Sequence, residues 1–337
     1  MTKKWNSIFQ YLFFLGLGVF LVWWSLHQIP SEKWGEFKNS LKTAKYWLLI
    51  PVFFILSLSH IIRALRWRIL MSPMGYKPSF VNTFFAVMIG YLANLAIPRM
   101  GEVLKCTILS KYEKVPAEKL VGTILVERAV DVISLGIVFL FALITQFDVM
   151  SDIVIQVFKQ LFENSTGHFS FVKSGIGLAI LIGCFIAIKV WFYQFAHLKI
   201  VIFLKKILKG IGEGVSSIKN LKQKGRFIFY SISIWSLYIL GTWVGLMATQ
   251  GTASLGIPHA LSALAFASIG MIVTPGGIGA YAFFLAKILE KNGIPFEIGF
   301  ANGTLQWFAQ FMIVVIIGSI CMGFLPFYNK KNKHESS

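Results

Sequence analysis

Long apolar stretches alternate along the chain with polar, mostly basic loops. A helix needs about 20 apolar residues to cross a bilayer, and the stretches that approach or exceed this length are residues 7–27, 46–67, 120–146, 171–192, 227–249 and 298–325. Between Phe227 and Ala286 there is no Lys, Arg, Asp or Glu, so this length must cross the membrane, turn inside it and return. The pattern predicts an all-α polytopic membrane protein with about six transmembrane helices.

Two further apolar segments, residues 79–98 and 258–286, are interrupted by proline and glycine. Proline removes a backbone donor and glycine weakens a helix, so each segment is expected to form a helix, a break and a second short helix. Non-helical backbone at membrane depth is tolerated only where protein or a water-filled cavity surrounds it. Both segments are therefore predicted to be hairpins that enter and leave the membrane on one side.

The basic loops set the expected orientation. Lys and Arg total 32 against 14 Asp and Glu, and residues 199–226 carry eight basic residues and one acid, which is typical of a cytoplasmic loop. Residues 148–170 are acidic on balance and are expected outside. Counting spans from these loops puts both termini in the cytoplasm of a bacterial inner membrane, with residues 30–45 as an outside loop. The hairpin at 79–111 then opens from the cytoplasm and the hairpin at 258–290 from outside.

The composition also excludes some classes of function. The formal charge of +18 accompanies 56% apolar residues and no nucleic-acid recognition module, so it is better explained by anionic membrane lipids than by nucleic acid. The three cysteines, Cys106, Cys184 and Cys321, lie far apart and predict neither a zinc site nor a disulfide. No metal and no cofactor is expected.

The two broken segments belong to a weak but ordered internal repeat. The paired positions are Pro98 and Pro275, Pro116 and Pro295, Glu118 and Glu297, and Glu127 and Gln306. We expect one transmembrane domain over 1–329, with repeats at about 46–146 and 227–325, an amphipathic cytoplasmic link at 199–226 and a cytoplasmic tail at 330–337. Because the hairpins open from opposite sides, the repeat would be inverted, a pattern that indicates a transporter site near the midplane. The alternative, that proline and glycine only kink two packed helices, stays open.

Charged residues lie inside the predicted membrane segments. Arg99 and Glu102 follow the first break, and Glu127, Arg128 and Asp131 lie near the start of the next helix. Such charges are expensive to bury unless they are paired or hydrated, so they are expected to face a cavity. The two arginines could hold a lipid phosphate, because guanidinium matches phosphate oxygens; the acids could balance them, bind a cationic headgroup or carry protons. The other reading is an ion-pair latch between hairpin and helix.

The second break carries no charge but offers backbone donors and a helix N-terminus, which favour an anionic group. Together with the polar positions around the first break, it completes the set of candidate substrate-binding residues. They are Asn94, Arg99, Glu102, Glu127, Arg128, Asp131, Thr274, Pro275, Gly276, Gly277, Gly279 and Tyr281.

Three motifs, IPRMGEVLK at 97–105, LVERAVD at 125–131 and TPGGIGAY at 274–281, carry a family resemblance. From about residue 9 to 325 the chain resembles the transmembrane flippase-like family found at the front of lysylphosphatidylglycerol synthases. The resemblance implies a bundle that moves an aminoacylated or other phospholipid between leaflets. The positions that match the family's polar residues are Arg99, Gly101, Glu102, Glu127, Arg128 and Asp131.

The chain departs from that pattern at two places. Many members carry a glutamate soon after the glycine-rich break, where this chain has Tyr281, and an arginine in the last helix, where it has Gln306 and Trp307. No soluble aminoacyl-transfer domain follows before Ser337, so synthesis of lysyl lipid is not expected.

The expected function is therefore lipid translocation and not catalysis, with a phospholipid as substrate, which could be aminoacylated or glycosylated. A membrane-embedded lipid-linked glycosyltransferase or phosphatase is one alternative, although no convincing nucleophile and base pair is visible. A non-catalytic scaffold for a lipid-modifying enzyme is another. Self-association into a homo-oligomer is left open.

Overall fold

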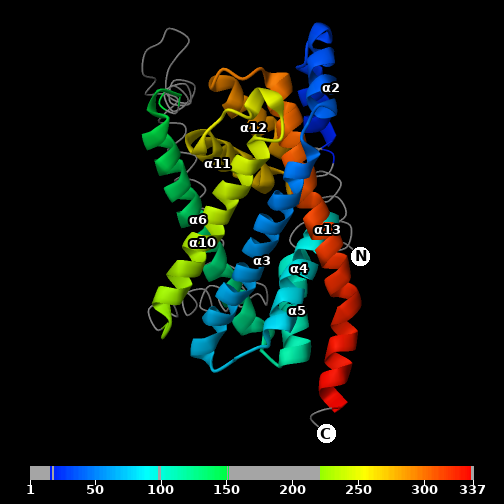
Figure 1. Ribbon diagram of the computed structural model, residues 1–337. Helices are drawn as coiled ribbons and strands as arrows, with labels where there is room; N and C mark the ends of the chain where they lie inside the picture. The colour runs from blue at the N-terminus through cyan, green and yellow to red at the C-terminus, as the bar shows by residue number, and fades with distance from the viewer. Residues whose placement is uncertain (1–15, 17–18, 98–99, 150, 152–220, 335–337) are drawn as a thin grey trace, which may run out of the picture.

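The computed structural model describes residues 16, 19–97, 100–149, 151 and 221–334 of the chain. Every regular element within these ranges is a helix (Figure 1). The predicted span at 171–192, most of the span at 7–27 and nearly all of the amphipathic link at 199–226 lie outside the described residues.

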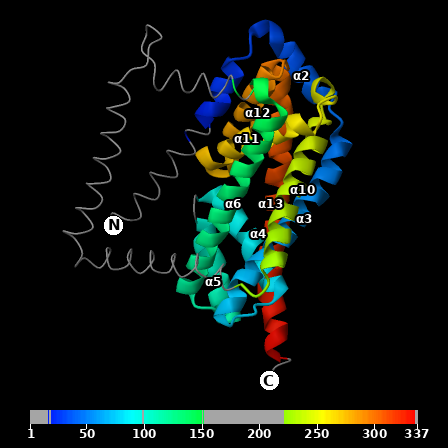
Figure 2. The same cartoon turned by 90° about the vertical axis from the view of Figure 1, so that its left-hand side faces the viewer.

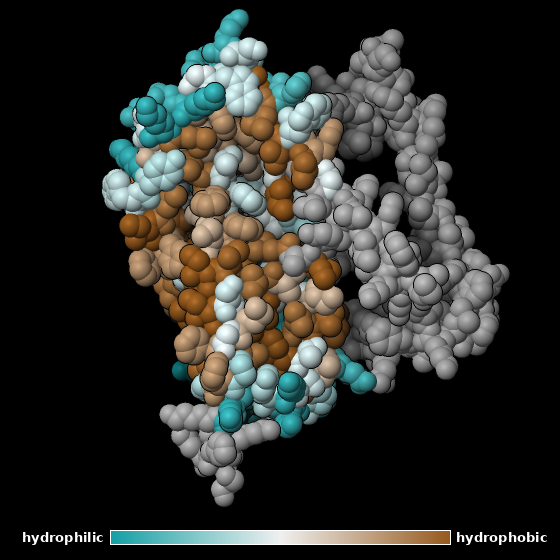
Figure 3. All heavy atoms as spheres, turned by 90° about the vertical axis from the view of Figure 1, so that its right-hand side faces the viewer, coloured by the Kyte–Doolittle hydropathy of each residue, from teal (hydrophilic) through white to brown (hydrophobic). Residues whose placement is uncertain are grey.

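Within the described ranges, four helices are long and apolar enough to cross a membrane. They are α3 (Leu49–Met71), α6 (Ala117–Thr145), α10 (Lys224–Leu246) and α13 (Phe296–His334). They coincide with four of the predicted spans and expose large apolar side chains along their length, which is the surface that lipid tails require. Figure 3 shows the result on one face, where an apolar middle separates two polar ends. The chain is a multi-pass integral membrane protein.

The first interrupted segment forms two helices, α4 (Phe80–Ala96) and α5 (Met100–Glu113), which pack closely against each other. The second forms α11 (Ile257–Val273), the single turn η5 (Pro275–Gly277) and α12 (Ala280–Lys291), and α11 and α12 also pack closely. Both breaks therefore fall where proline and glycine predicted them.

Small residues allow the two hairpins to close. A Cβ atom on Gly101 would collide with the backbone oxygen of Gly90 across the α4–α5 crossing. In the second hairpin, a Cβ atom on Gly270 would lie 2.6 Å from the carbonyl of Ala280. Close approach of backbones over small residues is a principal source of helix association in membranes, where lipid tails remove the hydrophobic driving force between helices.

The described helices fall into two sets with the same order. The set α3, α4, α5, α6 is followed by α10, α11, α12, α13; α3 and α10 have 23 residues each, and α4 and α11 have 17 each. Figures 1 and 2 agree that the α4–α5 hairpin lies toward the end of the molecule where the chain terminates, and the α11–α12 hairpin toward the other end. The sets also exchange partners, because α4 packs on α13 and α11 packs on α6, while α3 and α10 pack on each other.

Two boundaries differ from the sequence predictions. Residues 30–45, expected as a loop, contain η1 (Ser31–Lys33) and a short amphipathic helix, α2 (Trp34–Lys42), whose Phe37 is buried and which packs against α13. The last helix continues past the predicted tail boundary to His334. The charged residues at 30–45 were read as a loop, although a helix at a membrane surface carries such charge on its polar face.

We expect Gly101→Ala to destabilise the chain, because the added methyl group has no space at the α4–α5 crossing. Overpacking of this kind costs about 1–3 kcal/mol. Gly136→Ala in α6 is the matched control, since nothing lies within 4 Å of its added Cβ and alanine favours a helix. Thermal unfolding of the purified variants in detergent measures both; equal midpoints would show that the crossing tolerates a side chain.

Candidate functional site

Four charged side chains meet between α3 and α6. Arg63 Nη1 lies 2.9 Å from Glu127 Oε1 and 2.7 Å from Asp131 Oδ2, and Arg66 Nη2 lies 2.7 Å from Asp131 Oδ1 and 3.5 Å from Glu127 Oε1. The arginines are three apart on α3 and the acids four apart on α6, so each pair shares one helix face. Two positive and two negative charges therefore cancel in a place where Arg66 and Glu127 are almost fully buried. We call these four residues the charge network.

The charge network also reaches α10. Arg63 Nη2 donates to the Tyr238 hydroxyl at 2.9 Å, and Arg66 Nη1 donates to Ser231 Oγ at 3.4 Å. One turn farther along α3, Trp67 Nε1 donates to Thr123 Oγ1 of α6 at 2.9 Å. The three long helices α3, α6 and α10 are thus joined by polar contacts at one level of the bundle.

Sequence reasoning missed Arg63 and Arg66, which are both buried within α3. A signal was present in the sequence: arginines three apart in one apolar helix and acids four apart in another can pair face to face. The latch interpretation fits Glu127, but its partners are on α3 and not on the first hairpin.

A cavity of about 690 Å³ lies between the two sets of helices and is lined by residues from α3, α4, α6, α10, α11, η5, α12 and α13. Its polar lining includes His60, Arg63, Asn94, Arg128, Asp131, Gln306 and Gln310. Its apolar lining includes Leu56, Val132, Leu135, Trp235, Met271, Ile272 and Phe311. The charge network therefore forms part of the wall of a space that combines charged and apolar surface.

The cavity brings together most of the predicted site residues. Those that line it are Asn94, Arg128, Asp131, Thr274, Pro275, Gly276 and Tyr281. Glu102 does not line it but pairs with Arg128, and Glu127 is buried in the charge network behind it. Gly277 and Gly279 belong to the second break without lining the cavity. Arg99 lies outside the described residues.

Arg128 is held less tightly than the two arginines of the charge network. Its Nε lies 3.4 Å from Glu102 Oε1, and both side chains are about two-fifths exposed. Neither of its Nη atoms has a hydrogen-bond partner among the residues that the structure describes. The terminal donors of Arg128 can therefore meet an anion in the cavity, while Arg63 is already held by two carboxylates.

The second break is a hydrogen-bonded loop at the cavity wall. Gly276, Gly277 and Gly279 have φ of 62°, 73° and 70°, a left-handed conformation that glycine adopts without strain. Trp307 Nε1 on α13 donates to the Gly276 carbonyl at 2.8 Å, and Thr274 Oγ1 donates to the Ile278 carbonyl at 3.0 Å. Trp307, where the chain departs from the family pattern, therefore connects this loop to the last helix through a hydrogen bond.

Sequence reasoning missed a buried lysine beside the cavity. Lys105 on α5 is 2% exposed, and its Nζ lies 4.9 Å from the Tyr91 ring centroid and 5.4 Å from the Trp67 ring centroid. The aromatic rings supply the attraction that a carboxylate would otherwise give. Its spacing in α5 does not distinguish it from a surface lysine, so the sequence held no signal for this contact.

Comparison with known proteins gives the family and one relative. The family model described as "Lysylphosphatidylglycerol synthase TM region" matches residues 9–318. A curated relative, the UPF0104 membrane protein MJ1595 of Methanocaldococcus jannaschii, is 26% identical over 295 residues, which cover 81% of this chain and 83% of that protein. No solved structure matches the chain. The match includes the charge network and the second break.

We expect Glu127→Gln to destabilise the chain strongly, because it leaves Arg63 and Arg66 with one carboxylate between them. Removing one partner of a buried pair costs about 3–5 kcal/mol. Glu102→Gln is the same substitution at a half-exposed pair, where the expected loss is at most about 1 kcal/mol. Unfolding midpoints in detergent compare the two, and equal shifts would mean that the charge network does not hold α3 to α6.

Proposed function

We propose that this chain, which belongs to the lysylphosphatidylglycerol synthase TM region family, is a lipid translocase that moves a phospholipid between leaflets through the central cavity. The observation that carries the proposal is the mixed lining of that cavity, with charged and amide side chains on one part and apolar side chains on the rest. A phospholipid has the same two chemistries in one molecule. A small polar solute would leave most of this wall unused, and a purely apolar one would leave the charges unpaired.

The rim of the cavity supports lateral entry of lipid. Val132 on α6 and Ile272 on α11 line the cavity, yet 66% and 73% of their surface is exposed. Apolar side chains that face both the cavity and the outer surface allow lipid tails to remain in hydrocarbon while the headgroup lies inside. An aqueous solute would need a polar entrance instead.

Arg128 is the residue that we assign to the lipid phosphate. It lines the cavity, and among the described residues its Nη atoms have no hydrogen-bond partner and its one ion pair is the half-exposed contact with Glu102. A phosphate diester can take over the Arg128 contact with better geometry than a carboxylate held at 3.4 Å through Nε. Glu102 lies on α5, so this exchange would release the first hairpin from α6.

We infer that the two sets of helices are an inverted repeat with re-entrant hairpins. Such a repeat lets one set move against the other, so that the cavity opens in turn to each side of the membrane. Three observations support the inverted repeat: α3 matches α10 and α4 matches α11 in length, the hairpins lie at opposite ends, and α4 packs on α13 as α11 packs on α6. The paired positions Glu127 and Gln306 support it too. Glu127 binds Arg63 of α3, whereas Gln306 Nε2 donates to Asn302 Oδ1 at 2.8 Å and Asn302 Nδ2 donates to the Gly245 carbonyl of α10 at 2.9 Å.

The remaining parts of the proposal follow from this role. The chain would work as a transporter and not as an enzyme, in a bacterial cytoplasmic membrane with both termini in the cytoplasm. The headgroup could be aminoacylated or glycosylated, and anionic lipids would surround the basic loops. Turnover of a lipid-linked sugar by the purified protein would favour the membrane-embedded enzyme in its place.

Arg128→Gln should slow the transfer of fluorescent phospholipid across liposomes that contain the purified protein. A hydrogen bond to a charged group contributes about 1.5–3 kcal/mol, so the expected loss is about ten- to hundredfold. Lys119→Gln is the control: it removes a cation from the same helix outside the cavity. Full activity of Arg128→Gln would contradict the assignment of the phosphate site.

Filling the cavity from an uncharged position should also block transfer. Ser268 on α11 lines the cavity and donates its hydroxyl to the Leu264 carbonyl, so Ser268→Phe adds a ring to the open space. Ser233 on α10 makes the same contact with the Phe229 carbonyl but does not line the cavity, and Ser233→Phe is the control. Both variants should fold; normal transfer in Ser268→Phe would place the lipid path elsewhere.

A further inference from the structure

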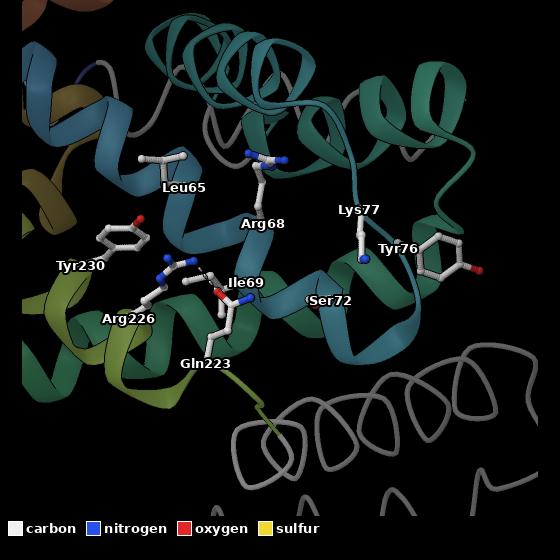
Figure 4. A pocket seen from close by; sticks show the side chains of 9 residues that line it. All are labelled: Leu65, Arg68, Ile69, Ser72, Tyr76, Lys77, Gln223, Arg226 and Tyr230. Carbon is white, nitrogen blue, oxygen red and sulfur yellow. Dashed lines mark hydrogen bonds between the residues drawn. The ribbon is translucent and has the colours of Figure 1, made fainter.

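A second hollow lies away from the central cavity, between the ends of α3 and α10. Its volume is about 260 Å³, and its wall comes from the last turns of α3, the link that follows α3 and the first turns of α10. Figure 4 shows Arg68 and Lys77 from the α3 side and Gln223 and Arg226 from the α10 side around it. We call this hollow the basic groove.

Among the described residues, the basic groove carries positive charge without a carboxylate to balance it. Arg68, Lys77 and Arg226 line it, and no Asp or Glu is among its lining residues. Arg68 Nε donates to the Pro78 carbonyl at 2.9 Å, and Arg226 Nη1 donates to Gln223 Oε1 at 3.4 Å, so both guanidinium groups are held by neutral partners. Within the described part of the chain, no carboxylate forms a salt bridge with any of the three. Such a cluster of cations attracts an anion.

The start of α10 points to the same ligand charge. A helix N-terminus is the positive end of the helix dipole, and acids in the first turn normally stabilise it. In α10 the first turn has no acid and contains the groove residue Arg226 instead, and the N-cap residue Gln223 makes no side-chain cap hydrogen bond. An anion in the basic groove would satisfy this helix end and the three side chains together.

Apolar surface begins directly beside the basic groove. Phe229, one turn after Arg226 on α10, is 65% exposed, and Ile232 is 61% exposed. Tyr76 and Tyr230 line the groove, and tyrosine is enriched where the polar and apolar zones of a membrane meet. An anion held here would have lipid tails, and not water, alongside α10. This favours a lipid headgroup over free phosphate.

We propose that the basic groove binds the phosphate headgroup of an anionic phospholipid, with its tails along α10. The groove lies at the end of the bundle where α13 ends, and it shares no lining residue with the central cavity. The proposal does not rest on lipid translocation, because it concerns a lipid that stays bound. A lipid at this position would contact the ends of both α3 and α10, two helices that pack on each other.

The test compares two double variants of the full chain in nanodiscs of phosphatidylcholine that contain a minority of phosphatidylglycerol. Lys77→Gln with Arg226→Gln removes two groove cations; Lys222→Gln with Lys224→Gln removes two exposed cations next to the groove that do not line it. Native mass spectrometry counts retained phosphatidylglycerol, and thermal unfolding reports the stabilisation that it gives. Both doubles carry an added Arg128→Gln substitution, so that lipid in the central cavity is not counted.

We expect the groove double to retain phosphatidylglycerol roughly thirtyfold less than its parent, at about 1 kcal/mol for each cation and tenfold per 1.4 kcal/mol. The flanking double should retain it nearly as well as the parent. Equal loss in both doubles, or no preference of the parent for phosphatidylglycerol, would overturn the proposal. Equal stabilisation by inorganic phosphate in pure phosphatidylcholine nanodiscs would assign the groove to free phosphate instead.

Discussion

The structure depends on the cancellation of four charges between α3 and α6, three of them on buried residues. Burying an unpaired charge in a bilayer has a high free-energy cost, and partners of opposite sign and hydrogen bonds are needed to offset it. Arg63, Arg66, Glu127 and Asp131 meet this condition as a set, because each carboxylate contacts both guanidinium groups. The set fixes which faces of α3 and α6 meet, and the contact with Tyr238 sets α10 against both.

This cancellation decides which charge remains for a ligand. If Arg63 and Arg66 are satisfied by the protein, an anion in the cavity gains little by approaching them and would have to compete with two carboxylates. Arg128 lies on the same helix as Glu127 but points to a half-exposed partner on α5, so its contact can be exchanged. One motif of seven residues therefore serves two purposes: Glu127 and Asp131 hold the bundle, and Arg128 stays available.

Much of this organisation could be predicted from the sequence, because apolar length and proline act locally. The long helices, both breaks and the polar wall around Asn94, Arg128 and Tyr281 follow from spacing along single segments. The partners of Glu127 could not be predicted in the same way, since pairing across 64 positions depends on how α3 and α6 meet. The burial of Lys105 between two aromatic rings could not be predicted for the same reason, because nothing in the neighbouring sequence distinguishes it from a surface lysine.

The two sets of helices solve one packing problem with different chemistry. In the first set a charged residue of the fourth helix, Glu127, binds the first helix through arginine; in the second set Gln306 does so through Asn302 and backbone carbonyls. A cavity between a charged wall and a neutral amide wall is electrostatically one-sided. In the translocation proposed above, an anionic headgroup would stay close to the first set while the second set moves, because among the lining residues only the first set offers charge. If the second set moves while the headgroup stays beside the first set, the anion does not have to pass from one charged site to another.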